Sequence, residues 1–324
     1  METTRLGTSD LNISRLGFGC WQLGGYGWQG LDHTEIETAV LKAIDQGVTL
    51  FDTADVYGLG SSEERLGRLI PKSRDDIVIA SKFGVRIDDN GRSYYDNSRD
   101  WIFKAVEGSL KRLHRDCIDL YQLHWHTPER PLDEIFEDLE TLRTQGKIKY
   151  YGVSNVDLVH DWGGKPYPKA LASFSFEYNL CERKWEDQVN TLERDHKLSF
   201  LSWGSLAQGL LSGKYRKGHR FDKKDHRSSK GYYFRAGRWE FNESLLELMQ
   251  DLSVKYDRSL PQIAIRWILD SHPDAVALIG IKTLDNLSDN MGSIGWSLAP
   301  EDLQKLDTQT QDMRYVEQRI KKGF

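Results

Sequence analysis

The chain has 324 residues, of which 39% are hydrophobic and 29% are charged. It contains no run of about 18 apolar residues, the length that a membrane-spanning helix needs, and its 36 aromatic residues are too many for a disordered chain. A net charge of −5 argues against general affinity for nucleic acid. The first twelve residues, METTRLGTSDLN, lack the apolar stretch of a signal peptide, and three widely spaced cysteines favour neither disulfides nor a zinc site. We therefore expect a cytoplasmic globular protein that binds neither membranes nor nucleic acids.

Apolar strand patterns alternate with amphipathic helix patterns along the chain. A short polar hairpin is predicted first, with strands at 4–6 and 12–14. Further strands are predicted at 16–19, 50–51, 77–80, 118–123, 148–153, 174–178, 198–203 and 275–279. Helices are predicted at 34–45 (with Thr34 as N-cap), 62–69, 101–113, 133–144, 185–195, 243–256, 261–269 and 284–291.

Eight apolar strands that alternate with helices predict an α/β protein, a (β/α)8 TIM barrel with an N-terminal β-hairpin. The alternative is a doubly wound sheet, but no GxGxxG motif follows the first strand. No linker or shift in composition divides residues 1–324, so we expect a single domain. The segment 217–238 interrupts the alternation after the seventh strand and holds eight Lys or Arg and two Asp. Such a long basic loop is either functional or mobile, or simply a solvated charged surface.

Polar residues at the carboxyl ends of barrel strands face the active site. Asp52, Lys82 and His124 close the second, third and fourth strands, and Tyr57 follows the second. Taken singly, Asp52 could be a helix cap, Lys82 a surface charge and His124 a buried core residue. Together they can deliver a proton: the Lys82 ammonium is expected to lower the pKa of Tyr57, Asp52 to hold Lys82, and His124 to bind the substrate oxygen. This set has no strong nucleophile, so a hydride donor must come from elsewhere.

Several stretches resemble the aldo-keto reductase superfamily in order and spacing. They are GFGCW (17–21), FDTADVYGLGSSEERLG (51–67), IASKFG (79–84), IDLYQLHW (118–125), YGVSN (151–155), EYNL (177–180) and SWGSLAQGLLSGKY (202–215). The resemblance runs from about Arg5 to Asn290 and is nearest to the bacterial branch, which GCWQLGGYGWQG and ALIGIKTLDNL also suit. It implies an enzyme that reduces aldehydes or ketones to alcohols with hydride from NADPH. Tyr57 would be the general acid, in a catalytic tetrad with Asp52, Lys82 and His124.

The resemblance also implies contacts with the cofactor. Ser154 and Asn155 match the pair that holds the nicotinamide carboxamide, and Trp203 matches an aromatic residue that stacks on the nicotinamide ring. The loop that wraps the pyrophosphate is matched by Gly204, Ser205, Leu206, Gln208, Gly209 and Leu211. The segment that receives the adenosine phosphate and the adenine is matched by Gly280, Lys282, Asn286 and Asn290. The remaining expected cofactor contacts are Gly19, Cys20, Trp21, Asp52, Ser175 and Lys214.

Three positions depart from the family pattern. Ser175 replaces a glutamine after strand six, and Ile279 replaces a proline before the phosphate-binding glycine. No second basic residue stands near Asn286, which leaves Lys282 as the main partner for a 2′-phosphate. We still expect NADP to be preferred over NAD. The walls of the pocket for a small carbonyl substrate are expected to be Trp21, Trp28, Tyr57, His124 and Trp125.

Two other functions are weighed against this one. His124 and His126 have a spacing that metallohydrolase barrels use, but no second histidine pair or carboxylate at a later strand end completes such a site, so no metal is expected. Potassium-channel β subunits resemble the same family and bind NADP as regulatory, oligomeric partners. A regulatory or redox-sensing subunit with slow or no turnover is therefore the alternative to an enzyme.

Overall fold

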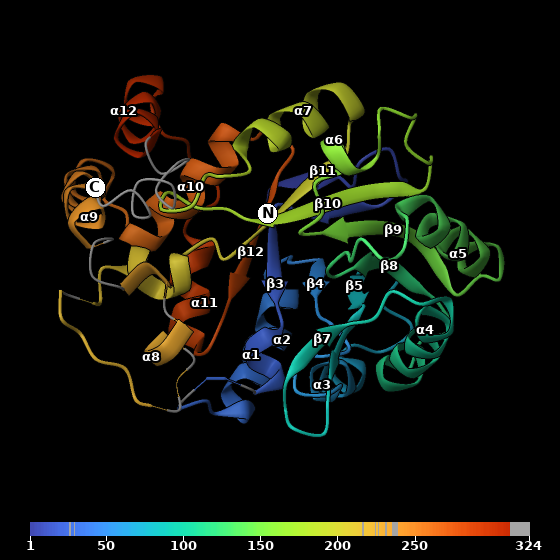
Figure 1. Cartoon of the computed structure of the whole chain (residues 1–324). Coiled ribbons are helices and arrows are strands. Elements are labelled where there is room, and N and C mark those ends of the chain that lie inside the picture. Colours follow the sequence, from blue (N-terminus) through green and yellow to red (C-terminus); the bar gives the residue numbers. More distant parts are fainter. Residues whose placement is uncertain are drawn as a thin grey trace.

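A computed structural model of the chain shows a closed barrel of eight parallel strands surrounded by helices (Figure 1). The structure describes residues 1–311 except positions 26, 29, 216, 224, 226, 231 and 235–238; at 229, 230, 232 and 239–241 it describes the backbone alone. The barrel strands follow one another in chain order: β3 (Leu16–Gly19), β4 (Leu50–Asp52), β5 (Val78–Phe83), β8 (Ile118–Leu123), β9 (Ile148–Ser154), β10 (Leu171–Glu177), β11 (Ser199–Trp203) and β12 (Val276–Gly280). Pairing of β12 with β3 closes the barrel. The predicted (β/α)8 barrel is confirmed.

The predicted helices are present, with small differences at their ends. They are α2 (His33–Asp45), α3 (Ser61–Leu69), α4 (Arg99–Leu113), α5 (Leu132–Thr144), α7 (Glu186–His196), α9 (Trp239–Tyr256), α10 (Leu260–Ser271) and α11 (Leu284–Met291). The prediction that Thr34 caps α2 is wrong. Asp32 is the N-cap, and its carboxylate accepts hydrogen bonds from the amides of Thr34 and Glu35 at 2.9 and 3.3 Å. A carboxylate also interacts favourably with the positive end of the helix dipole.

Several further elements were not predicted. They are the helices α1 (Trp21–Gly24), α6 (Leu158–Asp161), α8 (Arg227–Lys230) and α12 (Pro300–Thr310), the 3-10 turns η1 (Ala207–Ser212) and η2 (Tyr232–Phe234), and the antiparallel hairpin of β6 (Val85–Ile87) and β7 (Ser93–Tyr95). Most have too few residues to show a hydrophobic period. Within the described part of the chain, no helix combines the length and the apolar composition required to cross a membrane.

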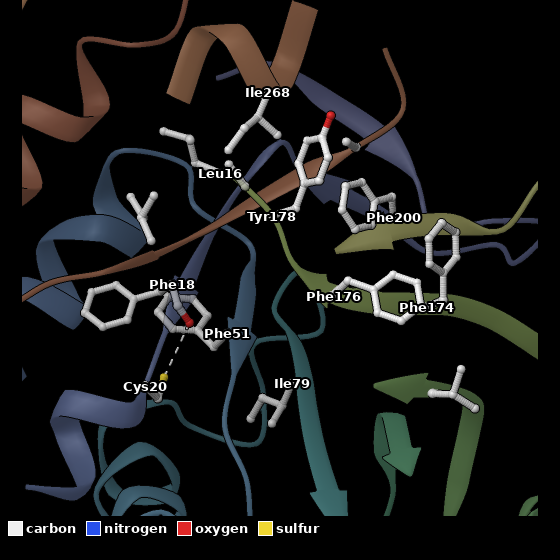
Figure 2. Packing of buried hydrophobic residues seen from close by; sticks show 14 of the residues in the cluster. Leu16, Phe18, Cys20, Phe51, Ile79, Phe174, Phe176, Tyr178, Phe200 and Ile268 are labelled. Carbon is white, nitrogen blue, oxygen red and sulfur yellow. Dashed lines mark hydrogen bonds between the residues drawn. The ribbon is translucent and has the colours of Figure 1, made fainter. Parts of the chain in front are cut away.

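The barrel strands send alternate side chains to two separate hydrophobic cores. In β4 and β5, Leu50 and Val78 belong to a small cluster inside the barrel, whereas Phe51 and Ile79 belong to the large cluster between strands and helices. Figure 2 shows the large cluster, in which Phe174 of β10 stacks on Phe200 of β11 at a ring distance of 5.3 Å. The strict alternation follows from the two-residue period of a strand. It also decides which polar residues at the strand ends face inward.

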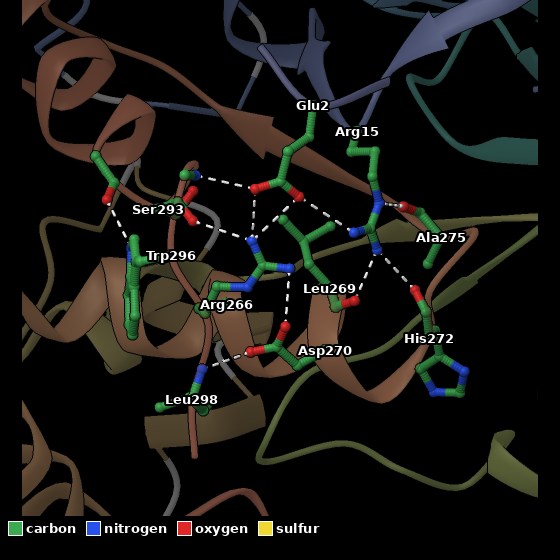
Figure 3. Close-up of polar contacts among 12 residues, drawn as sticks. Glu2, Arg15, Arg266, Leu269, Asp270, His272, Ala275, Ser293, Trp296 and Leu298 are labelled. Atoms are coloured by element: carbon green, nitrogen blue, oxygen red, sulfur yellow. Dashed lines mark hydrogen bonds and ion pairs between the residues drawn. The ribbon is translucent and has the colours of Figure 1, made fainter. Parts of the chain in front are cut away.

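The predicted N-terminal hairpin is present as β1 (Thr3–Arg5) and β2 (Asn12–Ser14), and it closes the amino end of the barrel. Leu6 and Ile13, fully buried, join the inner cluster. Glu2 accepts hydrogen bonds from the guanidinium groups of Arg15 and Arg266, and this ties the hairpin to α10 (Figure 3). With the amino end filled in this way, the open end of the barrel is the one where the strands finish.

Candidate active site

The polar residues predicted at the strand ends share the inward register of the barrel. Asp52 lies two residues after Leu50, and Lys82 lies four residues after Val78, so each follows an inner-cluster residue by an even number of positions. The register places Asp52 beside Gly19 and Ala80, and Lys82 beside Gln122. Both side chains are almost fully buried. The fold therefore brings the two charges together inside the barrel mouth.

Lys82 is the centre of this group. Its ammonium donates to Asp52 Oδ1 at 2.5 Å, to the Thr53 carbonyl oxygen at 2.9 Å and to the Tyr57 hydroxyl at 3.5 Å. Gln122, a residue the sequence analysis did not single out, donates from Nε2 to the second oxygen of Asp52 at 3.3 Å. The three donations direct the ammonium hydrogens of Lys82, and Gln122 holds Asp52 in place. The arrangement delivers a charged donor to the Tyr57 hydroxyl.

The electrostatics of Tyr57 differ from the expectation. Burial raises the pKa of Tyr57, and the Lys82 ammonium, which lowers it, offsets only part of this effect. The expectation that the pKa of Tyr57 lies below its ordinary value is therefore wrong, because the pKa is raised overall. Lys82 itself acts in the expected direction. Burial lowers the pKa of Lys82, but Asp52 and Tyr57 outweigh it and leave that pKa raised. Tyr57 thus keeps its proton and Lys82 its charge at neutral pH.

His124 lies against Tyr57, with ring centres 5.8 Å apart and an interplanar angle of 79°. Burial and the Lys82 charge hold the pKa of His124 well below its usual value, so the ring is neutral. Its Nδ1 is buried without a hydrogen-bond partner among the described residues. The Asn155 amide donates to the main-chain oxygen of His124 at 3.2 Å, and Asn155 itself has a left-handed backbone, φ +58°. A neutral imidazole can orient a substrate oxygen without supplying a proton itself.

One pocket connects the tetrad with most of the expected cofactor residues. Its lining includes all four tetrad residues and Gly19, Cys20, Trp21, Trp28, Trp125, Ser154, Asn155, Ser175, Trp203, Gly204, Ser205, Leu206, Gln208, Gly209, Lys214, Gly280, Lys282, Asn286 and Asn290. Leu211 is the exception, because its side chain is fully buried in the large hydrophobic cluster and lies outside the lining. The lining also includes residues that the sequence analysis missed, among them Gln22, Glu177, Tyr215 and Arg227.

At one part of this pocket three cations approach one another. Burial, Arg227 and Lys214 together lower the pKa of Lys282 to about 8. The Lys282 ammonium lies 4.0 Å from the centre of the Trp28 ring, and the Arg227 guanidinium lies 5.3 Å from the same ring. Arg227, which comes from the segment after β11, thus gives Lys282 a basic neighbour that the sequence analysis did not single out. Mutually repelling cations in a half-buried pocket favour the binding of an anion.

The backbone after β11 is strongly curved next to these cations. Ala207 and Gln208 have left-handed backbones, φ +49° and +55°, between Gly204 and Gly209, whose φ values are also positive. Runs of left-handed and right-handed residues form concave surfaces of amide groups that bind anions. A Cβ at Gly209 would lie 3.2 Å from the Tyr215 ring, so the glycine also permits close packing there.

Buried polar atoms without protein partners test whether a nicotinamide dinucleotide suits this pocket. Among the described residues, Ser175 Oγ, Trp203 Nε1 and Gln208 Oε1 have none, although each residue lines the pocket. Such groups are costly to bury unless a ligand or water satisfies them. Together with the cations and the curved backbone, these donors and acceptors fit a polar, multiply charged ligand with amide and phosphate groups.

Part of the basic segment 217–238 is described and packs together. Phe221 and Phe234 lie 4.7 Å apart, and both contact Tyr215. Arg227 lies over Phe221 at 4.3 Å and donates to the Tyr215 hydroxyl at 2.8 Å. The positions 224, 226, 231 and 235–238 of this segment fall outside the described residues. The described part is thus an aromatic cluster with an arginine at its centre, next to the pocket.

Within the described residues, no metal site is assembled around His124. His126 Nε2 lies 2.8 Å from the carbonyl oxygen of Arg130, within the loop that follows β8. Over the residues that the structure describes, no group of three or more His, Cys, Asp or Glu side chains could hold a metal ion.

Comparison with known proteins gives a consistent family. The model of the Aldo/keto reductase family matches residues 15–310. The aldo-keto reductase YhdN of Bacillus subtilis is 36% identical over 95% of this chain and 93% of its own, and the NADH-specific methylglyoxal reductase of Escherichia coli is 30% identical over 93% and 96%. The structure of the glycerol dehydrogenase AKR11B4 from Gluconobacter oxydans superimposes with a TM-score of 0.84 at 32% identity, over 95% of this chain and 94% of that one. The chain belongs to the aldo/keto reductase family of oxidoreductases.

Proposed function

We propose that this protein reduces aldehyde or ketone carbonyls to alcohols with NADPH, and that residues 1–324 act as a single domain. The observation that carries the proposal is one pocket with a proton donor at one part and a cluster of cations at another. Family membership supports a nicotinamide cofactor and a small carbonyl substrate. Family membership does not decide between NADPH and NADH, since one relative is named as NADH-specific. The proposed preference for NADPH therefore rests on the cations around Lys282 alone.

Tyr57 is the proposed general acid. In the reaction the carbonyl carbon gains a hydride, which the nicotinamide supplies when bound, and the carbonyl oxygen gains a proton. Tyr57 donates that proton, because its hydroxyl is held by Lys82 and its pKa keeps it protonated until the oxygen becomes basic. Lys82 then stabilises the phenolate that remains. Neutral His124 donates a hydrogen bond that orients the carbonyl oxygen.

The remaining pocket residues are proposed to bind the cofactor. Ser154, Asn155 and Ser175 would hold the carboxamide, and Trp203 would support the nicotinamide. The curved segment 204–209 would hold the pyrophosphate, and Lys282 with Arg227 and Lys214 would hold the 2′-phosphate. Asn286 and Asn290 would receive the adenine.

A cofactor-consumption assay tests the proposal. The purified protein is mixed with NADPH or NADH and a panel of small, branched and aromatic aldehydes and ketones, and loss of reduced cofactor is followed. Turnover that is faster with NADPH supports the proposal, whereas faster turnover with NADH contradicts the choice of cofactor. Tight binding of NADPH without turnover on any carbonyl would instead favour the regulatory or redox-sensing alternative.

A further inference from the structure

The hairpin β6–β7 extends the aromatic wall of the pocket. It is inserted between barrel strand β5 and helix α4, at the end of the barrel where the tetrad lies. The ring of Tyr95 stacks on that of Trp125, with centres 5.8 Å apart and an interplanar angle of 17°. Trp125 lines the pocket, and Tyr95 is 47% exposed. The two rings therefore form one aromatic surface that leads from the pocket to solvent.

Asn97 ties this surface to the barrel. Its amide nitrogen donates to the Trp125 carbonyl oxygen at 3.1 Å, and its amide oxygen accepts from the Thr127 backbone at 2.8 Å. Arg130 donates to the Asn97 carbonyl oxygen at 2.8 Å. Asn97 is almost fully buried, and a Cβ at Gly84 would come within 2.8 Å of its side chain. The chain on both sides of the ring pair is thus fixed before any ligand binds.

The neighbouring Tyr94 has a different environment. The Arg86 guanidinium lies 5.2 Å from the Tyr94 ring and 4.0 Å from the Trp101 ring, and it pairs with Asp96 at 2.7 Å. Tyr94 is 40% exposed and does not line the pocket. Because consecutive strand residues point to opposite faces, Tyr94 provides a control of the same size and similar exposure on the same hairpin.

The charged residues of the described pocket lining fall into two groups. One group is Asp52 and Lys82, which belong to the tetrad and pair with each other. The other described charged residues of the lining, such as Lys282 and Arg227, cluster with the segments proposed to bind the cofactor. A substrate tail that passes Trp125 meets the flat π surfaces of Trp125 and Tyr95. Flat apolar groups bind to such surfaces through stacking and burial.

We propose that Tyr95 and Trp125 form an outer subsite for a planar aromatic tail, so that the preferred substrates are aryl aldehydes or aryl ketones whose rings extend beyond the reacting carbonyl. This inference rests on the proposed function for the identity of the reacting group. Tyr95 acts as a specificity-determining residue that adds a second ring to the surface offered by Trp125.

The test compares a long and a short substrate in three variants. For 2-naphthaldehyde, Tyr95→Ala is expected to raise KM about three- to tenfold with little change in kcat, which is the scale of one aromatic contact. For propanal, which has no aromatic tail to stack on Tyr95, kcat/KM is expected to be unchanged. Tyr95→Phe keeps the ring and Tyr94→Ala keeps the subsite, so both are expected to behave like the wild type with both substrates.

Equilibrium dialysis with 2-naphthylmethanol, the corresponding alcohol, measures the subsite without turnover. Binding of the alcohol that is about three- to tenfold weaker in Tyr95→Ala, but unchanged in Tyr94→Ala, supports the subsite. This result would support the subsite even if the protein reduced no aldehyde, an outcome that would contradict the proposed function alone. Equal losses for 2-naphthaldehyde and propanal would mean that Tyr95 supports only the shape of the pocket. That result, or unchanged binding of the alcohol by Tyr95→Ala, would overturn the proposal.

Discussion

The guanidinium of Arg227 lies 5.3 Å from the centre of the Trp28 ring, and this contact joins two segments on different sides of the pocket. Trp28 precedes α2, whereas Arg227 begins α8 in the basic segment after β11. Asp225 holds the guanidinium with two hydrogen bonds, 2.9 and 2.7 Å long. The contact places part of the basic segment where it can respond to a bound dinucleotide.

We expect NADPH to protect the basic segment against trypsin. Lys217, Arg220 and Lys223 are exposed and offer cleavage sites. Phosphate groups neutralise the cations of the segment, so bound NADPH should hold it against the pocket and slow cleavage, less so at high salt. Arg227→Ala should weaken this protection because it removes the contact with Trp28. Cleavage at equal rates with and without NADPH would contradict a cofactor-dependent closure.

Tyr57→Phe is expected to lower kcat at least about a hundredfold, the usual scale for the loss of a general acid. Binding of NADPH should change little, because the hydroxyl that is removed faces Lys82 rather than the cations near Trp28. Steady-state kinetics and a fluorescence titration with NADPH measure the two effects. Tyr150→Phe, whose hydroxyl bonds to Asp10 near the N-terminal hairpin, is the control. Near-normal turnover of Tyr57→Phe would rule out the proposed acid.

The pKa directions at the site predict a flat pH profile for reduction. Burial keeps Tyr57 protonated, and burial together with Lys82 keeps His124 neutral. At saturating NADPH, we expect kcat/KM for the carbonyl substrate to stay constant from about pH 6 to about pH 9, since neither Tyr57 nor His124 changes its charge in that range. A decline centred near pH 6.5 that is absent in His124→Asn would show instead that His124 takes up a proton during the cycle.

Lys282→Ala is expected to weaken NADPH about tenfold to a hundredfold and to leave NADH nearly unaffected, as for the loss of one charge-assisted contact. Burial and the neighbouring cations lower the pKa of Lys282 to about 8, and a bound phosphate would raise it again. Binding of NADPH at pH 8 should therefore take up a proton, whereas NADH should not.

Calorimetry in two buffers of different ionisation enthalpy measures this proton uptake. Lys282→Ala should abolish it, and the exposed Lys165→Ala, which lies outside the pocket, should retain it. Equal uptake with NADPH and NADH would show that Lys282 does not contact the 2′-phosphate.

Glu2→Gln tests the closure of the amino end of the barrel. Partial burial opposes the ionisation of Glu2, but the Gly295 amide and the Arg266 and Arg15 guanidinium groups outweigh it and lower its pKa (Figure 3). The stabilisation is therefore present above the unfolded-state pKa, near 4.5, and is lost as the pH falls further. We expect Glu2→Gln to reduce the free energy of unfolding by about 1 kcal/mol at neutral pH and by much less at pH 3.

Urea denaturation at the two pH values measures that difference. Glu107→Gln, which removes an exposed partner of Lys147, is expected to have almost no effect at either pH. A loss at pH 3 as large as that at neutral pH would mean that the charge of Glu2 is not what stabilises the hairpin.

The barrel and the proposed tetrad could be predicted because their signals are local or periodic. Each barrel strand is a short apolar run, and the barrel itself dictates that residues at the strand ends, such as Asp52 and Lys82, meet. The order of DTADVYG, Lys82 and LHW carries the family resemblance in the same way. These features can be recognised in the sequence alone, because the inward-facing positions of a strand and its last residue both follow from counting residues along the chain.

The tertiary structure alone decided the contacts between irregular segments. Arg227 contacts Trp28, and Tyr95 stacks on Trp125. These residues lie in loops and short elements that show no hydrophobic periodicity in the sequence, and their paths depend on packing against the rest of the fold. The net pKa of Tyr57 was also beyond the sequence, because burial, which comes from the whole fold, exceeds the effect of the single lysine that the motif supplies. The sequence by itself thus determined the barrel and which residues stand at its strand ends, and packing across the loops decided their protonation and the outer walls of the pocket.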